Sequence, residues 1–136
     1  MIIQSLFNVP HRLTSCIDFV SAHFGNREYF AEMLTDCTRS SDRLPQGYIL
    51  FKDDNIIGFV GLIRQECIVC ENLSPWISPL LVAPEERGNQ FGRLLLEHVR
   101  KEAGRLGYFK LYLTTDHIGY YEKYGFREIG LSLFTW

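Results

Sequence analysis

The chain has 136 residues and a mass of 15.8 kDa, a length at which one folded domain spanning residues 1–136 is expected. Hydrophobic residues make up 46% and charged residues 22% of it, which is typical of a globular protein and excludes intrinsic disorder. The formal net charge is -2 and no block of Lys and Arg occurs, so nucleic acid is not an expected partner. The apolar runs are far shorter than the roughly 20 residues of a transmembrane helix, and no signal-peptide pattern occurs, so we expect a cytoplasmic protein without a membrane partner.

Apolar residues in the first half of the chain follow the spacing of two helices and then of two strands. Leu13, Ile17 and Val20 belong to one stripe of an amphipathic helix with Pro10 in its first turn, and Gly25 ends the pattern. The later runs are rich in β-branched and aromatic residues, which predicts an antiparallel pair joined by a turn. The predicted elements are helices at 10–24 and 27–37, a polar loop at 38–46, and strands at 48–51 and 56–63 around a turn at 52–55.

The second half predicts a strand, a long helix that Gly107 ends, and a further strand. This order requires a crossover, so the strands before and after the long helix are expected to be parallel in an otherwise antiparallel sheet. Pro79 has no N–H to donate, which indicates an edge, a bulge or an opening in the first of these strands. The predicted elements are strands at 76–82 and 108–114, helices at 84–107 and 116–124, and one or two strands from residue 126. The whole pattern predicts a mixed α/β fold with about four helices around a mostly antiparallel sheet that contains one parallel pair.

The four cysteines, Cys16, Cys37, Cys67 and Cys70, are too few for a disulfide framework, so reduced thiols are expected. Cys67 and Cys70 have the spacing of a redox or zinc motif. A structural zinc site needs four ligands, and no second Cys pair or close His pair is present to complete it. We therefore expect no metal. A thiol redox or metal protein built on this pair stays a third functional class, which metal analysis and thiol titration would test.

The segment from Val82 to Leu95 carries the clearest chemical signal, because a strand passes through a glycine-bearing turn into a helix. The first four N–H groups of a helix lack intrahelical partners and the macrodipole is positive there, so the backbone at 88–92 is suited to bind an anion. Arg87 and Arg93 flank the turn and are placed to add charge-assisted hydrogen bonds to a phosphate. The alternative is an ordinary turn with solvated arginines. Gln90 interrupts the dinucleotide-binding glycine pattern, and no P-loop sequence is present.

Three motifs in this order resemble those of the GNAT superfamily of acyl-CoA-dependent N-acetyltransferases. The strand ends in Val82-Ala-Pro84, the turn reads Arg87-Gly-Asn-Gln-Phe-Gly92, and a later segment reads Tyr121-Glu-Lys-Tyr-Gly-Phe126. The resemblance is strongest over residues 75–126 and is limited before them to the order of helices and strands. Gln90 departs from the family pattern, because it stands where the motif has its first glycine and its side chain must turn away from a bound pyrophosphate.

The resemblance implies that acetyl-CoA is the co-substrate and that its acetyl group passes to a primary amine of a small molecule or peptide by direct attack. In the family the pantetheine arm lies along the strand that matches 80–82, where that strand diverges from the next parallel one, and Pro79 fits such an opening. The pyrophosphate lies at the helix N-terminus, where helix geometry by itself predicts an anion. The implied cofactor-binding residues are Leu80, Leu81, Val82, Arg87, Gly88, Asn89, Gln90, Phe91, Gly92 and Arg93.

Tyr121 is the catalytic residue that the resemblance implies. It matches the family tyrosine that gives a proton to the departing thiolate, and a phenol with an ordinary pKa of about 10 is protonated at neutral pH. Its alternative role is core packing, because Tyr120 and Tyr124 nearby are aromatic as well.

The resemblance assigns no base. Family members of the histone type have a glutamate at the position that matches Trp76, and tryptophan cannot take a proton. The remaining candidates are Glu71 before the cofactor strand and the pair of Asp116 and His117 after the last parallel strand, where open sheets commonly place ligands. His117 titrates in a useful range, although Asp116 also fits the cap of a helix that contains His117. A relay of water molecules is the further alternative.

The sequence defines the acceptor no further than an amine. Exposed carboxylates are usually solvated, and aromatic residues at helical spacing are usually buried in the core. Some residues of both kinds are nevertheless candidates to bind an acceptor. These candidates are Phe24, Tyr29, Trp76 and Tyr120 for the pocket wall, and Glu28, Glu32 and Glu71 for a cation. A non-catalytic acyl-CoA-binding or sensor domain is the competing function. Gln90 and the missing strand carboxylate favour it, whereas Tyr121 favours an enzyme.

The C-terminal residues Phe134-Thr-Trp136 follow soon after the first strand beyond the last helix, whereas the family generally adds another strand. An unpaired apolar edge recruits a partner strand, so we expect a homodimer or a strand exchange that covers it. The expected partners are therefore an amine substrate and a second copy of the chain.

Overall fold

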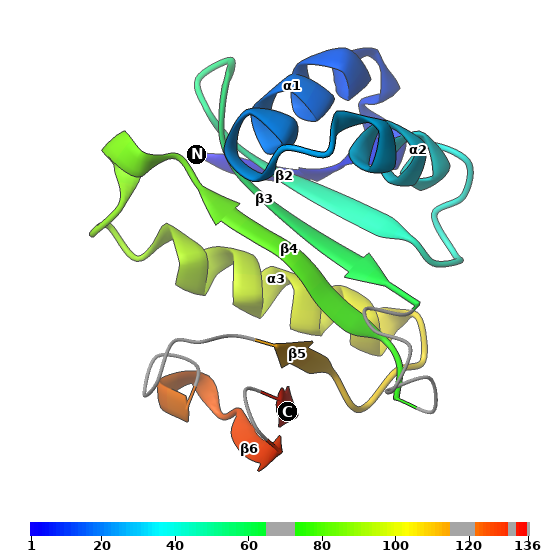
Figure 1. The fold of residues 1–136 in the computed structure, drawn as a ribbon, viewed down its shortest axis with the longest axis vertical. Helices are drawn as coiled ribbons and strands as arrows, with labels where there is room; N and C mark the ends of the chain where they lie inside the picture. Colours follow the sequence, from blue (N-terminus) through cyan, green and yellow to red (C-terminus); the bar gives the residue numbers. More distant parts are fainter. Residues whose placement is uncertain (65–72, 115–121, 131–132, 136) are drawn as a thin grey trace.

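A computed structural model describes residues 1–64, 73–114, 122–130 and 133–135 (Figure 1). Three α-helices lie in these ranges, α1 (Leu13–Phe24), α2 (Arg27–Cys37) and α3 (Phe91–Arg105). The strands are β1 (Ile2–Ser5), β2 (Gln46–Lys52), β3 (Asn55–Ile63), β4 (Trp76–Val82), β5 (Tyr112–Thr114), β6 (Arg127–Gly130) and β7 (Leu133–Thr135). Short 3-10 turns are η1 (Leu6–Asn8), η2 (Pro10–Arg12), η4 (Pro84–Glu86) and η5 (Glu122–Tyr124). Within the described ranges, no helix combines the length and the apolar character that a membrane crossing requires.

The strands form one sheet in the order β1-β2-β3-β4-β5-β7-β6. Every pair is antiparallel except β4 and β5, which are parallel through Trp76 and Tyr112. These two strands precede and follow α3, so the predicted crossover is confirmed. The mixed α/β fold predicted from the sequence is the fold observed.

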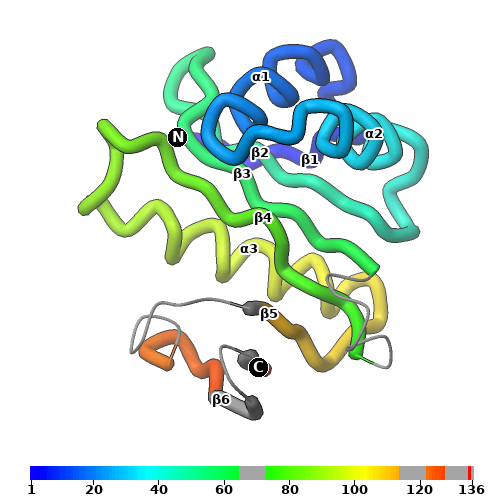
Figure 2. Tube along the Cα trace, viewed as in Figure 1, coloured from blue at the N-terminus to red at the C-terminus, as the bar shows by residue number. Residues whose placement is uncertain are grey.

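Helices cover both faces of this sheet (Figures 1 and 2). Tyr48 and Leu50 of β2 pack in the core beneath α3, whereas Ile49 and Phe51 pack in the core beneath α1 and α2. Successive side chains of a strand point to opposite faces, so a strand buried on both faces consists of an unbroken apolar run. The uninterrupted Tyr48-Ile-Leu-Phe51 sequence therefore follows from the position of β2 inside the sheet.

The sheet is irregular around the middle of β4. A register shift separates Val60 from Leu62 in the pairing of β3 with β4. Gly61 lies at this shift, and a Cβ there would come within 2.3 Å of the Ser78 carbonyl oxygen, so no other residue fits without a backbone shift. On the other side of β4, pairing with β5 within the described residues is confined to Trp76 and Tyr112. β4 therefore has both a bulge and an opening near Pro79, two of the features that this proline indicates.

Some boundaries differ from the prediction. The sequence analysis missed β1, and the α-helix predicted from residue 84 begins at Phe91, because η4 and an irregular segment at 87–90 precede it. β5 begins at Tyr112 and is shorter than the predicted strand at 108–114, and Tyr108 closes the end of α3 instead. Of the predicted helix at 116–124, residues 116–121 lie outside the described ranges and the remainder is the 3-10 turn η5. Two strands follow η5, and the later one, β7, pairs with both β5 and β6, so the expectation that a strand is missing and leaves the C-terminal residues at an unpaired edge is wrong. The sheet ends at β1 and β6.

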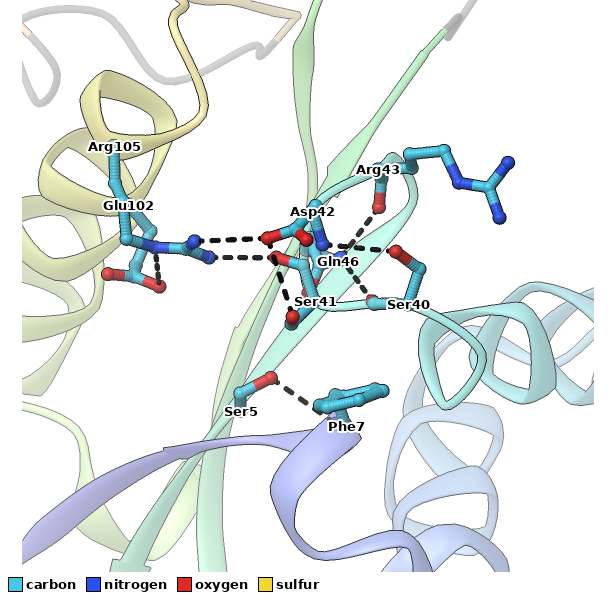
Figure 3. A network of polar contacts seen from close by, with 9 residues as sticks. All are labelled: Ser5, Phe7, Ser40, Ser41, Asp42, Arg43, Gln46, Glu102 and Arg105. Atoms are coloured by element: carbon cyan, nitrogen blue, oxygen red, sulfur yellow. Dashed lines mark hydrogen bonds and ion pairs between the residues drawn. The ribbon is translucent and has the colours of Figure 1, made fainter.

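The loop between α2 and β2 is fixed by side chains (Figure 3). Gln46 is 1% exposed, and its Nε2 donates to the carbonyl oxygens of Ser40 and Arg43 at 2.6 Å each. Arg105 of α3 donates from Nη2 to the carbonyl oxygen of Ser41 at 2.9 Å and lies 3.7 Å from the Asp42 carboxylate. The loop predicted at 38–46 is thus bound to the C-terminal end of α3.

Candidate functional site

A pocket of about 640 Å³ lies where β4 passes into α3. Its lining comes from four places that are far apart in the sequence: the end of α1, the end of β4, the segment that begins α3, and η5. The lining residues are His23, Phe24, Leu80, Leu81, Val82, Arg87, Gly88, Gln90, Phe91, Gly92 and Tyr124. The pocket therefore joins an apolar wall along β4 to the polar backbone at the start of α3.

The backbone at 87–90 reverses direction through two residues in the left-handed region. Gly88 has φ +88° and Gln90 has φ +63°. A left-handed conformation is free for glycine but costs about 1–2 kcal/mol for a residue with a Cβ. Gln90 therefore adopts a backbone conformation that favours glycine, although it carries a side chain.

Hydrogen bonds within the protein hold this segment in place. Asn89 donates from Nδ2 to the Glu86 carbonyl oxygen at 3.1 Å, and Arg87 donates from Nε to the Val82 carbonyl oxygen at 3.3 Å. Lys52, at the end of β2, lies 3.4 Å from the Glu86 carboxylate. The turn before α3 is thus fixed to both β4 and the neighbouring hairpin before any ligand binds.

The first turn of α3 has open hydrogen-bond donors. Its N-cap residue, Gln90, makes no side-chain cap, and the first turn contains no acidic residue. Leu94 donates to the Gln90 carbonyl oxygen at 3.3 Å, but the N–H groups of Phe91, Gly92 and Arg93 have no acceptor among the described residues. Unpartnered N–H groups and the positive end of the macrodipole together favour an anion. The geometry at this helix start is that of an anion-binding site.

A shallower hollow of about 500 Å³ adjoins the pocket and shares Gly88 and Gln90 with it. Asn89 and Arg93 line this hollow. Arg93 donates from Nε to Glu97 at 2.9 Å and from Nη1 to the Gln90 side chain at 3.4 Å. The structure thus brings all ten predicted cofactor-binding residues to the walls of these two adjoining depressions.

The predicted catalytic residues lie outside the part of the chain that the structure describes. These are Tyr121, Glu71, Asp116 and His117, and the same holds for Tyr120 and for the pair of Cys67 and Cys70. η5 begins at Glu122, directly after Tyr121 in the sequence, and its Tyr124 lines the pocket.

The aromatic residues proposed for an acceptor differ in their surroundings. Phe24 lines the pocket, and its ring lies 4.6 Å from that of His23. Tyr29 is half exposed on α2. Trp76 is fully buried and donates from Nε1 to the Leu73 carbonyl oxygen at 2.6 Å. The interpretation of Trp76 as a pocket residue is therefore wrong, because it is a core residue between β4 and the α1–α2 layer.

Sequence reasoning missed His23 and Tyr124 as pocket residues. No local pattern marks His23, and each of the two residues reaches the pocket through the way that α1 or η5 packs on the sheet. The spacing of Tyr121 and Tyr124 within one motif is the only sequence signal that places Tyr124 near a site.

The described cysteines have the surroundings of packing residues. Cys16 and Cys37 are free and fully buried. Burial raises the pKa of the Cys16 thiol to about 12, and it also raises the pKa of Cys37. A thiol in such surroundings stays protonated and is unreactive. Within the described ranges, no group of three or more His, Cys, Asp or Glu residues is arranged to hold a metal ion.

The sequence matches a family model described as "Acetyltransferase (GNAT) domain" over residues 45–128. This match includes β2 to β4, α3, β5 and η5, and thus every part of the pocket except the end of α1. No curated protein matches the chain in sequence.

Solved structures of acetyltransferases have a similar fold. An aminoglycoside 6'-acetyltransferase type Ii superposes with a TM-score of 0.75 and 22% identity over 100% of this chain and 96% of that chain. An aminoglycoside 6'-N-acetyltransferase complexed with coenzyme A superposes with a TM-score of 0.74 and 19% identity, over 99% of this chain and 93% of that chain. A GNAT family acetyltransferase from Brucella melitensis in complex with acetyl-CoA superposes with a TM-score of 0.68 and 18% identity, over 99% of this chain and 87% of that chain. At these identities the likeness establishes the fold.

Proposed function

The chain belongs to the GNAT acetyltransferase family and is an acetyltransferase, and on that premise we propose that it transfers an acetyl group from acetyl-CoA to a primary amine by direct attack. The observation that carries this proposal is the open start of α3, where the N–H groups of Phe91, Gly92 and Arg93 have no acceptor within the described residues. The acceptor is a small molecule or a peptide.

The residues present fit coenzyme A. The N–H groups at the start of α3, flanked by Arg87 and Arg93, have the charge and geometry to bind its diphosphate. Leu80, Leu81 and Val82 offer an apolar wall on the side where β4 has separated from β5, which suits the pantetheine arm. When bound, acetyl-CoA supplies the thioester that an amine attacks.

Tyr121 is the proposed acid. A phenol with the ordinary pKa of tyrosine is protonated at neutral pH, so it can give its proton to the sulfur atom as the carbon–sulfur bond breaks. Glu71, Asp116 and His117 are the proposed candidates for the group that takes the proton from the amine, and a relay of water molecules is the alternative. The placement of η5 beside the pocket supports Tyr121 as the acid, since η5 directly follows it.

The first experiment separates an enzyme from a non-catalytic acyl-CoA sensor. Release of free thiol from acetyl-CoA is measured over a panel of amines, and calorimetry measures binding of acetyl-CoA to the same preparation. Turnover with at least one amine is the expected result. Tight binding without turnover on any amine would favour the sensor instead.

Tyr121→Phe tests the acid. A positioned acid contributes about 10² to 10⁴ in rate, so kcat is expected to fall by that factor while the dissociation constant of acetyl-CoA stays the same. The substitution keeps the ring, so circular dichroism and thermal unfolding serve as controls for the fold. An unchanged kcat would remove Tyr121 from the mechanism and leave the cofactor site in place.

We also propose that the protein is cytoplasmic, that it folds as a single domain and that it forms a homodimer. The reduced, buried thiols of Cys16 and Cys37 are compatible with a reducing compartment. The sheet ends at β1 and β6, and one of these edges is the proposed contact between two copies.

A further inference from the structure

η4 contains two carboxylates, Glu85 and Glu86, directly before the turn that leads to the proposed diphosphate site. Glu85 is exposed, whereas the side chain of Glu86 is only 17% exposed. Like charges repel over several ångströms, so a carboxylate held near a diphosphate weakens its binding unless a cation balances the charge. Lys52 contacts the Glu86 carboxylate and supplies such a cation.

Glu86 is part of the hydrogen-bonded framework of the turn. Its backbone N–H donates to the Ala83 carbonyl oxygen at 2.9 Å, and its own carbonyl oxygen accepts from Asn89 Nδ2 at 3.1 Å. Asn89 directly precedes Gln90, the left-handed N-cap residue of α3. A residue in this conformation keeps it only where the surrounding structure fixes it. The position of Glu86 therefore bears on how the chain enters α3 and presents the open N–H groups.

Lys52 reaches Glu86 from the hairpin between β2 and β3. Its Nζ donates to Glu86 Oε1 at 3.4 Å, across 34 residues of sequence. The hairpin is itself held by η2, because Arg12 donates to the Asp54 carbonyl oxygen and its guanidinium lies 4.9 Å from the centre of the Phe51 ring. Lys52 thus extends from a fixed support to the carboxylate beside the turn.

We propose that Lys52 is a positioning residue for coenzyme A, which balances the charge of Glu86 and holds its carboxylate toward the hairpin, so that the start of α3 meets the diphosphate without an opposing charge. The inference rests on the proposed function, in which the diphosphate binds at the start of α3. Lys52 does not contact the ligand in this role.

Lys52→Met removes the cation and leaves the Glu86 carboxylate unpaired. The dissociation constant of coenzyme A, measured by calorimetry, is expected to rise about three- to tenfold. Dephospho-coenzyme A keeps the diphosphate and should lose the same factor. Pantetheine has no phosphate, so its dissociation constant should change less than about twofold. An equal loss for coenzyme A and pantetheine would indicate a general structural effect and overturn the inference.

Two further variants serve as controls for charge and folding. Lys101→Met removes one positive charge from an exposed position of α3 and should leave the affinity for coenzyme A at its native value. Lys52→Arg keeps a cationic donor, so it should bind coenzyme A within about twofold of the native protein. Thermal unfolding establishes that each protein is folded. Equal losses in folded Lys52→Arg and Lys52→Met would overturn the inference.

Acetyl-CoA turnover gives a second readout. Lys52→Met should raise the KM for acetyl-CoA and leave kcat within about twofold of native, because the pair lies at the diphosphate and not at the thioester. A fall in kcat with an unchanged KM would contradict the assignment to diphosphate binding.

A double-mutant cycle tests whether Lys52 acts through Glu86. In the Glu86→Gln background, Lys52→Met should cost less than about twofold in coenzyme A affinity, because no carboxylate is left to balance. Equal losses in both backgrounds would mean that Lys52 attracts the phosphates directly, and would overturn the inference. Glu85→Gln is the matched control, in which Lys52→Met should keep its full effect.

The failure of this inference is distinguishable from the failure of the proposed function. If the native protein does not bind coenzyme A, the diphosphate site at the start of α3 fails and the inference fails with it. If the native protein binds coenzyme A and folded Lys52→Met binds it equally well, only the role of Lys52 is refuted.

Discussion

The two ends of α3 are built in opposite ways. At the C-terminal end, Gly107 has φ +93° and donates to the Gly104 carbonyl oxygen at 3.0 Å, and Tyr108 donates to the Ala103 carbonyl oxygen at 2.8 Å. This is the Schellman arrangement, in which the chain itself satisfies the last carbonyls of the helix. At the N-terminal end, the N–H groups of residues 91–93 find no acceptor within the described part of the chain.

The surroundings of the two ends follow the same division. Arg105 near the C-terminal end contacts Glu102 and the loop at 38–46, so that end is tied to the rest of the protein (Figure 3). The N-terminal end faces a pocket and an adjoining hollow. The open donors of α3 therefore lie at the pocket, whereas the chain itself satisfies the carbonyls at the other end of the helix.

A carboxylate placed at the open end should give the largest effect. Gln90→Asp puts a negative charge beside the N–H groups of residues 91–93, and aspartate tolerates the left-handed backbone better than most residues do. The charge stabilises the helix start and repels the diphosphate, so acetyl-CoA affinity is expected to fall about 100-fold while the free energy of unfolding rises by up to about 1 kcal/mol. Calorimetry and chemical denaturation measure the two quantities.

Gln90→Asn is the matched control, since it has the same shape as the aspartate without its charge. It should keep acetyl-CoA affinity within about threefold of the native value, because its side chain adds no charge that repels the diphosphate. Equal affinity of the aspartate variant and the native protein would show that no anion binds at this helix start, and the comparison between the two ends would lose its functional meaning.

The closed end should respond in stability and not in binding. Gly107→Ala forces a Cβ into a left-handed conformation, which is expected to lower the free energy of unfolding by about 1–2 kcal/mol. Gly104→Ala is the matched control within α3, where alanine should raise stability by up to about 1 kcal/mol through helix propensity. A Cβ at either glycine meets open space, so the two variants differ in backbone conformation alone. A loss of acetyl-CoA affinity in folded Gly107→Ala would contradict the division between the ends.

The sequence predicted the closed end of α3 and the residues of the open end, but it did not predict where the helix begins. Gly107 is a recognisable C-terminal signal, and the motif at 87–92 identified the turn. Pro84 favours the first turn of a helix, and the sequence analysis therefore began the helix there. In the structure Pro84 starts η4, and two left-handed residues then separate η4 from α3. Whether Gln90 accepts a left-handed conformation depends on the surrounding contacts, which residue type alone does not reveal.

The site was predictable where one continuous segment forms it and unpredictable where distant segments meet. The walls from 80–82 and 87–93 come from one strand–turn–helix unit, so a local motif was sufficient to find them. His23 reaches the pocket from α1, and Arg100 contacts Tyr124 across 24 residues. Trp76 was misinterpreted for the same reason, because its burial depends on α1 and α2 packing over β4. No spacing rule encodes such tertiary contacts.

The smallest effects come from a matched pair of arginines at the two ends of the helix. Arg93 and Arg105 are both half exposed, and each has a carboxylate partner on α3, Glu97 at 2.9 Å and Glu102 at 3.2 Å. Arg93→Met should weaken acetyl-CoA binding about three- to tenfold, since one charge-assisted contact to a phosphate is lost, and should leave stability nearly unchanged. Arg105→Met should leave binding unchanged and lower the free energy of unfolding by about 0.5–1 kcal/mol, because its hydrogen bond to the Ser41 carbonyl oxygen is lost.

The salt dependence of acetyl-CoA binding distinguishes the roles of Arg93 and Arg105 further. A contact between an exposed arginine and a phosphate is screened by salt, so the affinity difference between native protein and Arg93→Met should shrink as ionic strength rises from low values to about 0.5 M. Arg105→Met should bind acetyl-CoA like the native protein at every salt concentration. If both variants lose the same affinity with the same salt dependence, the charge of α3 acts as a diffuse field, and the two ends of the helix are not functionally distinct.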